Sequence, residues 1–302
     1  MKKFILRLTL FILVLFVSIE SYIRFNHLAI DIPERTINEF GIQCYVPNQS
    51  GYWTGGTHQW QINSEGWPGE APKHLSNLIT LIGDSHIENF MNEDDCHLGT
   101  LLNQSNLKYN FLETGRSGAT FIEYLEIAKY LQSKYKTVKQ LIFVKESDFA
   151  ESIAQEGRKN DVVQVDLEKD EIVPGTINSP FLKKAFYSIK TLFFFRSSLM
   201  NAGPRMEFSK QKSKQLQENH SAEYCQKLLQ FIKSKYKVDN LIFCLHPETS
   251  DEIVTLFEQF GLNYYRFKTE DNLKWRNSPD DVDHWNCFGF QQATKQIRTL
   301  LQ

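Results

Sequence analysis

The sequence predicts an α/β fold in which a five-stranded parallel sheet lies between two layers of helices. Short apolar segments recur from residue 77 onward, and segments with an apolar residue at every third or fourth position separate several of them. Strands that alternate with helices are joined by right-handed crossovers, which make the strands parallel. The predicted strands are 77–82, 109–112, 140–144, 240–245 and 262–267, and the clearest helices are 121–135 and 222–236.

Composition restricts the class of protein. A chain of 302 residues with 41% hydrophobic content can form one substantial core. The net charge of -2 and the dispersed basic residues argue against nucleic acid as a partner. The cysteines form no Cys-x-x-Cys pair, so no zinc site is indicated, and an oxidising compartment would permit disulfides whose connectivity the sequence leaves open. They are Cys44, Cys96, Cys225, Cys244 and Cys287.

Residues 1–25 differ from the rest of the chain. Lys2 and Lys3 precede an almost wholly apolar segment that ends near Ile19. A charged start followed by a hydrophobic stretch directs a chain to a membrane. No small-residue cleavage site follows, which favours an uncleaved anchor over secretion after signal cleavage. Basic residues are concentrated before the apolar segment, so we expect a cytoplasmic N-terminus and an extracytoplasmic domain, periplasmic or at the cell surface.

The remaining chain divides into a lead-in and a main domain. Residues 26–76 are rich in Gly, Pro, Asn and aromatic residues, which predicts irregular structure or short edge strands packed on the domain. The main domain, 77–302, contains an insertion at 149–220 that is too long for a simple loop. Within it, 161–172 is a charged surface excursion. Residues 181–200 predict an amphipathic helix packed on the core, with a role at the membrane surface or in a substrate tunnel as alternatives.

Ser85 is the candidate nucleophile. It follows a buried strand, at the sheet edge where ligands bind in open α/β folds. A serine needs a base, and His284 is the best candidate because Asp281 precedes it by three residues and can orient its ring. Asp283 is less suitable, since adjacent side chains in an extended loop diverge. The alternative for His284 is a surface histidine with incidental acidic neighbours.

Two further positions fit this chemistry. Gly118 lies in a glycine turn after the second strand, where backbone can approach a ligand and donate hydrogen bonds to an oxyanion, although such a glycine can also be only a turn. Asn286 can cap a closing helix over 289–301, which would place His284 on the loop that enters this helix.

Other interpretations use the same residues. Asp84 and His86 could be a metal pair of the kind found in binuclear metallophosphoesterases. That chemistry needs an asparagine–histidine cluster after a later strand, and the segment around His246 lacks the asparagine, so we predict no metal site. His246 could line the cleft or be a plain loop histidine. The lead-in aromatics could stack on sugars or simply pack; they are Tyr52, Trp53, Trp60 and Trp67.

Together these motifs resemble the SGNH, or GDSL-like, hydrolases over residues 76–302. They are Gly83-Asp84-Ser85, Gly118 after the second strand, and Asp281-x-x-His284 near the C-terminus. The lead-in segment Asn63-Ser64-Glu65-Gly66-Trp67 is similar to one in members associated with bacterial cell-surface polysaccharide acylation and deacylation. The resemblance implies a three-layer, flavodoxin-like α/β/α sandwich and no cofactor.

The resemblance also assigns roles. Ser85 would be the nucleophile and first oxyanion N–H donor, Gly118 the second donor, and His284 the base oriented by Asp281. The family's third strand ends in Gly-x-Asn-Asp, whose asparagine completes the oxyanion hole, and Ser147 stands in the asparagine position here.

The implied function is hydrolysis of acyl esters, in particular of O-acetyl groups on a cell-surface glycan, through an acyl-enzyme at Ser85. Attack by a sugar hydroxyl in place of water would make the protein an O-acyltransferase. Because Ser147 replaces an amide donor, a catalytically weak or inactive membrane-tethered module that binds a glycan or partner is a third interpretation. The expected partners are an acylated glycan or other ester and the membrane; the sequence identifies no protein partner.

Overall fold

The computed structural model describes residues 1–302 except 106, 203–221, 280 and 282–283. Its centre is a five-stranded sheet in the order β11-β10-β7-β5-β6, with every neighbouring pair parallel. The predicted fold class is therefore confirmed. The strands are β5 (Leu78–Gly83), β6 (Asn110–Gly115), β7 (Lys139–Val144), β10 (Leu241–Leu245) and β11 (Tyr264–Arg266).

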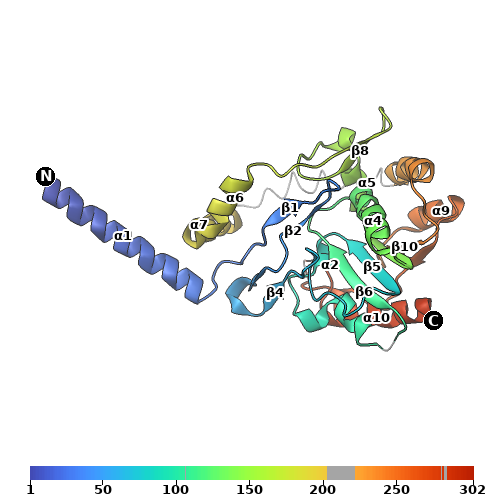
Figure 1. The fold of residues 1–302 in the computed structure, drawn as a ribbon, viewed down its shortest axis with the longest axis horizontal. Helices are drawn as coiled ribbons and strands as arrows, with labels where there is room; N and C mark the ends of the chain where they lie inside the picture. Colours follow the sequence, from blue (N-terminus) through green and yellow to red (C-terminus); the bar gives the residue numbers. More distant parts are fainter. Residues whose placement is uncertain (106, 203–221, 280, 282–283) are drawn as a thin grey trace.

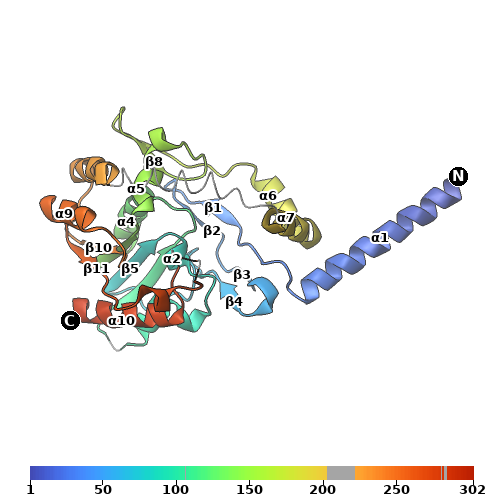
Figure 2. The ribbon, with the colours of Figure 1, turned by 180° about the vertical axis from the view of Figure 1, so that it is seen from behind.

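Helices cover both faces of the sheet (Figures 1 and 2). The two faces form separate apolar cores, because alternate side chains of each strand point to opposite sides. One core is covered by α4 (Phe121–Tyr135), α5 (Ser147–Ser152), the helix at residues 222–235 and α9 (Asp251–Gln259). The other is covered by α3 (Leu98–Asn103) and α10 (Cys287–Leu301).

Local sequence signals fix the ends of two of these helices. Thr120 caps α4 by accepting a hydrogen bond from the Glu123 N–H at 3.2 Å. Asn286 caps α10 by accepting from the Gly289 N–H at 2.9 Å, as its position before the predicted closing helix suggests. The α10 helix begins at Cys287, two residues before the predicted start.

Strand β6 continues three residues beyond its predicted end at residue 112. Glu113 and Thr114 are polar yet buried. The Glu113 carboxylate is compensated inside the domain, because it accepts from the Gly99 N–H and interacts with the buried His97 ring, both at 2.9 Å. A polar residue that finds hydrogen-bond partners inside the domain does not end a strand. A prediction from apolar residues alone therefore ends this strand too early.

The lead-in forms two short antiparallel pairs, as expected for edge strands. They are β1 (Arg35–Ile37) with β2 (Gln43–Tyr45), and β3 (Ser50–Tyr52) with β4 (Gln59–Gln61). After them, Asn63 accepts hydrogen bonds from the N–H groups of Glu65 and Trp67, which directs Trp67 into the core. Trp67 and Trp60 are 1% and 3% exposed. These two rings therefore pack inside the protein and present no face to a sugar.

The insertion carries structure of its own. Strands β8 (Gln164–Asp166) and β9 (Glu171–Val173) form a hairpin over the predicted charged excursion. The predicted single helix at 181–200 is instead two helices, α6 (Pro180–Ser188) and α7 (Lys190–Ala202), with extended backbone at Ile189 between them. No residue of α6 is buried, so the expected packing on the core is wrong for this helix.

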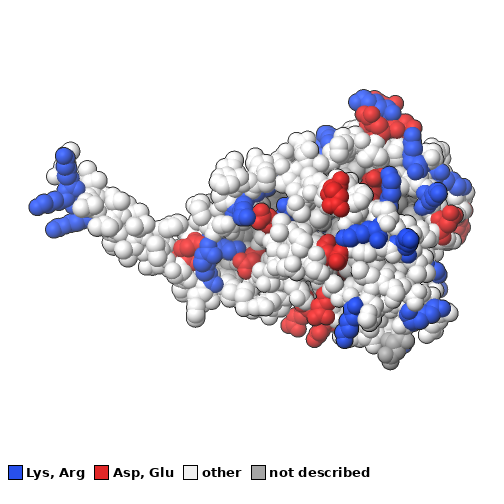
Figure 3. Space-filling view, viewed as in Figure 1, with Lys and Arg blue, Asp and Glu red and all other residues white. Residues whose placement is uncertain are grey.

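Helix α1 (Lys2–Phe25) projects from the body of the molecule (Figure 1). Its length and apolar composition are sufficient to cross a membrane. Basic residues gather at its outer end, while the shaft is uncharged over most of its length (Figure 3). A helix of this kind fits either an anchor or a signal sequence.

Candidate active site

Ser85 lies where the strand order reverses. From β5 the chain passes to β6 on one side and then returns to β7 on the other. Open α/β sheets bind ligands beside the carboxyl ends of the strands at such a point. Ser85 is the first residue of α2 (Ser85–Glu88), directly after β5. Asp84 caps this short helix by accepting from the His86 N–H at 2.9 Å. The strand-to-helix turn thus sets the Ser85 side chain at the sheet edge.

A continuous chain of hydrogen bonds joins the three predicted residues. The Ser85 hydroxyl oxygen is 2.8 Å from Nε2 of His284, and Nδ1 of His284 is 2.9 Å and 3.1 Å from the two carboxylate oxygens of Asp281. A carboxylate only accepts, so Nδ1 carries the proton and Nε2 is left to accept from Ser85. The His284 and Asp281 side chains are 23% and 27% exposed, so the site is open to solvent. Asp283 lies outside the described residues.

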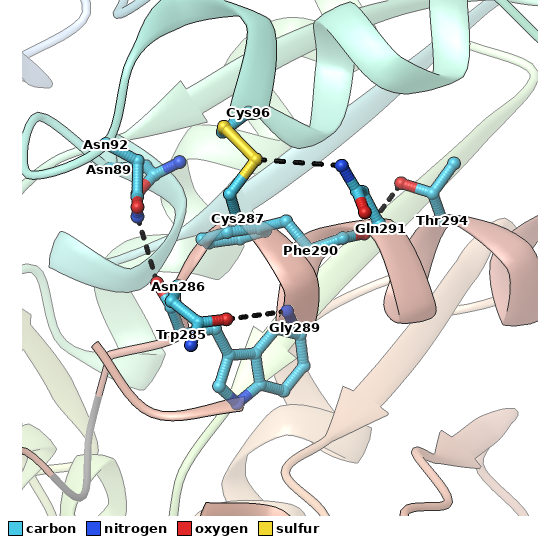
Figure 4. The surroundings of a disulfide bond; sticks show 10 residues. All are labelled: Asn89, Asn92, Cys96, Trp285, Asn286, Cys287, Gly289, Phe290, Gln291 and Thr294. Atoms are coloured by element: carbon cyan, nitrogen blue, oxygen red, sulfur yellow. Dashed lines mark hydrogen bonds between the residues drawn. A yellow bond between two sulfur atoms is a disulfide. The ribbon is translucent and has the colours of Figure 1, made fainter. Parts of the chain in front are cut away.

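Hydrogen bonds attach the histidine loop to the domain at His284 and at the next residue, Trp285. The His284 carbonyl accepts from the Asn277 N–H at 2.8 Å, and the next carbonyl, of Trp285, accepts from the Asn92 side chain at 2.9 Å (Figure 4). The Trp285 ring is buried and packs edge-on against His86, with 4.2 Å between ring centroids. The aromatic ring therefore anchors the loop that carries His284.

A disulfide joins Cys96 to Cys287, three residues after His284 (Figure 4). This bond settles the connectivity that the sequence left open. Cys287 is the first residue of α10, so the bond fixes the start of this helix, and the loop before it, to the segment preceding α3. The other cysteines, Cys44, Cys225 and Cys244, are buried free thiols.

We expect the double variant Cys96→Ser/Cys287→Ser to lose about 2–5 kcal/mol in the free energy of unfolding, because the bond closes a long loop. Chemical denaturation of the two proteins measures the difference. Dithiothreitol should destabilise the wild type and leave the double variant unchanged, which is the internal control. Equal denaturation midpoints for the two proteins under oxidising conditions would contradict a stabilising role for this bond.

Glycine at position 115 lets α2, the helix that begins at Ser85, pack against β6. A Cβ atom at Gly115 would lie 2.2 Å from the backbone nitrogen of Glu88, so no other residue fits there without displacing α2. The chain then turns at Gly118, which has a φ of +76° and open space on its Cβ side. Within the described residues, the backbone N–H groups of Ser85 and Gly118 donate no hydrogen bond. Both are therefore available as oxyanion donors.

Glu88 holds the turn that contains Gly118 against α2. Its buried carboxylate accepts from the Ser117 N–H at 2.7 Å, from the Ser117 hydroxyl and from the Tyr45 hydroxyl. The sequence analysis missed this residue. Its only local signal is a charged side chain in the first turn after Ser85, and the partners that compensate its burial come from β2 and from the turn after β6.

The structure does not join Ser147 to the other site residues. Ser147 is the exposed first residue of α5, and none of the hydrogen bonds among the described residues links its hydroxyl to Ser85, Gly118 or His284. Its role as a third oxyanion donor stays a prediction. Two residues earlier, the Lys145 ammonium lies 2.8 Å from the Asp84 carboxylate. Lys145, directly after β7, thus supports Asp84, the residue that caps α2.

Two carboxyl groups beside Lys145, the partly buried Asp84 and the buried Asp148, have opposite pKa shifts. Burial would raise the pKa of Asp84, but the Lys145 ammonium and hydrogen bonds outweigh it and lower the value. Burial and the negative charge of Asp84 raise the pKa of Asp148 to about 8. The Asp148 carboxyl accepts from the Lys145 N–H at 2.9 Å and from the Tyr124 hydroxyl at 3.3 Å. Asp148 is therefore protonated at neutral pH.

The raised pKa of Asp148 makes stability depend on pH. Because the unfolded protein binds this proton less tightly, the free energy of unfolding falls as pH rises from the ordinary value of 3.8 to about 8, and then levels off. Asparagine stays neutral, so we expect Asp148→Asn to remove this decline. The free energy of unfolding of the variant relative to that of the wild type should be about 1–3 kcal/mol higher at alkaline pH than at mildly acidic pH. Urea denaturation at both pH values tests this. Parallel pH profiles for the two proteins would contradict it.

The metal-pair interpretation gains no support from the described part of the chain. The Asp84 carboxylate is bound to Lys145 and to the His86 N–H, and the His86 ring is buried against Trp285. No group of three or more metal-ligating side chains gathers among the described residues. His246 accepts a hydrogen bond from the Trp285 ring at 3.2 Å, so it supports the histidine loop.

Comparisons with known proteins find solved structures of low sequence identity and low TM-score. No family model matches the chain, and a search of curated proteins found no match. A psychrotrophic esterase from Pseudoalteromonas sp. is 11% identical, with a TM-score of 0.37 over 75% of this chain and 99% of its own. A putative lipolytic protein of the G-D-S-L family from Desulfitobacterium hafniense is also 11% identical, with a TM-score of 0.37 over 75% of this chain and 100% of its own.

An acetyl xylan esterase from Butyrivibrio proteoclasticus is 10% identical, with a TM-score of 0.35 over 80% of this chain and 67% of its own. Scores and identities this low assign no activity to the chain. The function is therefore argued below from the side chains of the site.

Proposed function

We propose that the protein is a serine-dependent acyl-ester hydrolase of the SGNH type. The observation that carries this proposal is the hydrogen-bonded chain from Ser85 through His284 to Asp281 at the open carboxyl edge of the sheet. Nucleophile, base and orienting carboxylate are within hydrogen-bond reach of one another, which is the arrangement that activates a serine.

The geometry supports a two-step reaction. The Ser85 oxygen attacks the acyl carbonyl carbon while Nε2 of His284 takes the serine proton, and Asp281 stabilises the resulting imidazolium. The N–H groups of Ser85 and Gly118 donate to the oxyanion. The intermediate collapses, the alcohol leaves with the proton from His284, and an acyl-enzyme remains. Water then attacks this ester, gives its proton to His284, and the acid departs as Ser85 regains its proton.

The substrate that we propose is an acyl ester, in particular an O-acetyl group, on a cell-surface glycan. Helix α1, acting as an uncleaved anchor, would keep the domain at the outer face of the membrane, beside such polymers. The disulfide is of the kind that persists in an oxidising compartment outside the cytoplasm. If a sugar hydroxyl replaced water in the second step, the same residues would transfer the acyl group.

A phosphonofluoridate probe tests the nucleophile directly. Ser85 should attack the phosphorus, fluoride should leave, and the intact protein should gain the mass of one phosphonyl group. Peptide mass spectrometry should place the adduct on Ser85, and Ser85→Ala should gain no phosphonyl group. An adduct on another residue, or labelling that persists after heat denaturation, would contradict the proposal.

A second measurement identifies the substrate. Incubation with acetylated and with chemically deacetylated cell-envelope polysaccharide should release acetate only from the former. If Ser85 is labelled but no glycan releases acetate, the proposed serine hydrolase would stand and the proposed glycan substrate would be wrong. Appearance of acetyl groups on an added acceptor sugar would identify a transferase.

A further inference from the structure

We infer that α6 and α7 form a membrane-docking element that lies in the interface of the bilayer crossed by α1. The inference rests on the anchoring role proposed for α1. The exposed surface of these helices would contact lipid at the boundary between headgroups and acyl chains, beside the point where α1 leaves the membrane.

The two helices expose an unusual amount of apolar surface. On α6, Phe181 and Leu182 are 79% and 65% exposed, and on α7, Leu192, Phe195 and Leu199 are 48%, 51% and 72% exposed. No residue of α6 is buried, and no residue of either helix belongs to the apolar cores of the described residues. Clustered exposed aromatic and leucine side chains of this size mark an interaction surface.

The charge of this element suits a lipid surface. Residues 180–202 contain no Asp or Glu. Lys183 and Arg196 are exposed, whereas Lys184 pairs with Glu34 at 2.8 Å and the buried Lys190 pairs with Asp31 at 2.6 Å. Short helices with apolar residues on one side and Lys or Arg beside them bind at the headgroup boundary and are attracted by anionic lipids. The composition thus favours a bilayer over the acidic surface of a soluble partner, which would leave the apolar side chains in water.

Hydrogen bonds fix the element to the base of α1. The Glu20 carboxylate accepts from the backbone N–H groups of Lys190 and Thr191 at 3.0 and 2.8 Å, and so caps the start of α7. Arg24 pairs with Glu20 and donates to the Ser188 carbonyl at the end of α6. Both views of the ribbon show α6 and α7 beside this end of α1 (Figures 1 and 2).

This attachment also sets the depth of the element. Five residues separate Glu20 from Phe25, the last residue of α1, which corresponds to about 7 Å along a helix. Interfacial helices bury their apolar face by about 5–10 Å. When α1 spans the bilayer, α7 therefore starts at the depth that its exposed Leu192 and Phe195 side chains require.

Spin-label accessibility in the full-length protein tests the inference. The free thiols Cys44, Cys225 and Cys244 are buried, so an introduced cysteine is the preferred site of labelling. The variants are Phe181→Cys on α6, Phe195→Cys on α7, Leu13→Cys within α1, and Val138→Cys as the control, an exposed apolar position directly before β7. Each is placed in phosphatidylcholine–phosphatidylglycerol nanodiscs, and relaxation by oxygen is compared with relaxation by a water-soluble nickel chelate.

We expect the Phe181 and Phe195 labels to show an oxygen-to-nickel accessibility ratio several-fold above that of the Val138 label and approaching that of Leu13. A ratio equal to that of Val138 would overturn the inference. So would shielding from both reagents, with dipolar broadening between copies, since a second protein copy would then cover the surface. A Leu13 label exposed to water would overturn the anchoring and the inference together.

Ester hydrolysis by the same preparations separates this inference from the proposed function. The labelled positions lie outside the site, so turnover of p-nitrophenyl acetate should match the wild type in all four variants. If the ester is hydrolysed but the labels on α6 and α7 are exposed to water, only the inference of membrane docking is contradicted. If the labels lie in lipid but none of the proteins hydrolyses the ester, only the proposed hydrolase function is contradicted.

Discussion

Ser85→Ala and His284→Ala are each expected to lower kcat for p-nitrophenyl acetate by about 10⁵- to 10⁶-fold. Without the Ser85 hydroxyl no acyl-enzyme forms, and without His284 the hydroxyl keeps its proton and stays a weak nucleophile. The two residues are 2.8 Å apart and act as one unit. The double variant should therefore be no slower than either single variant, because the effects of residues that act together do not add.

Circular dichroism and thermal denaturation of these variants control for folding. Both side chains are partly exposed, so their truncation should change the free energy of unfolding little. Hydrolysis that survives Ser85→Ala in a folded protein would show that another residue is the nucleophile. Activity that depends on added metal and disappears with a chelator would instead favour the metal-pair chemistry of Asp84 and His86.

Asp281→Asn is expected to lower kcat by about 10⁴-fold while the fold is retained. The carboxylate can only accept, so it holds the proton of His284 on Nδ1. An asparagine can turn its amide toward the ring and donate to Nδ1, which moves the ring proton to Nε2. The ring then cannot take the proton of Ser85, although every heavy atom stays near its place.

Asp239→Asn is a matched control for this change, because Asp239 is an exposed carboxylate outside the site. It should hydrolyse ester at the wild-type rate. A loss of less than about tenfold in Asp281→Asn would show that Asp281 does not set the ring tautomer. Asp283, the other acidic neighbour of His284, would then be tested by the same substitution.

The covalent restraint near the site connects stability with catalysis. Cys287 both starts α10 and follows the histidine loop, so the disulfide and the Asn286 cap restrain the same turn. Reduction is therefore expected to affect the position of His284 as well as the overall stability.

Much of the fold was predictable because its signals are local. Helix α4 occupies the predicted residues, since its apolar period, its Thr120 cap and its end at Lys136 all lie within one stretch of chain. The five sheet strands were predictable from short apolar runs. Ser85, His284 and Asp281 could be grouped because the aspartate lies three residues before the histidine and the serine follows a buried strand.

Features that depend on distant partners were not predictable from local patterns. The sequence analysis assigned no connectivity to the cysteines, since spacing does not say which thiols meet. It ended β6 too early and missed Glu88, because each involves a buried carboxylate whose partners come from other elements. It also predicted one helix where Glu20, far away in the chain, caps the start of a second one at Lys190.

The sequence by itself determined the α/β class, the apolar N-terminal helix and the three residues expected to carry the chemistry. Only the tertiary structure decided that Ser85 and His284, which are 199 positions apart, lie within hydrogen-bond distance. It also decided that α6 and α7 adjoin α1 instead of the core. The physical reason is that periodicity and capping are properties of neighbouring residues, whereas burial, pairing and cross-linking depend on which surfaces meet when the chain folds.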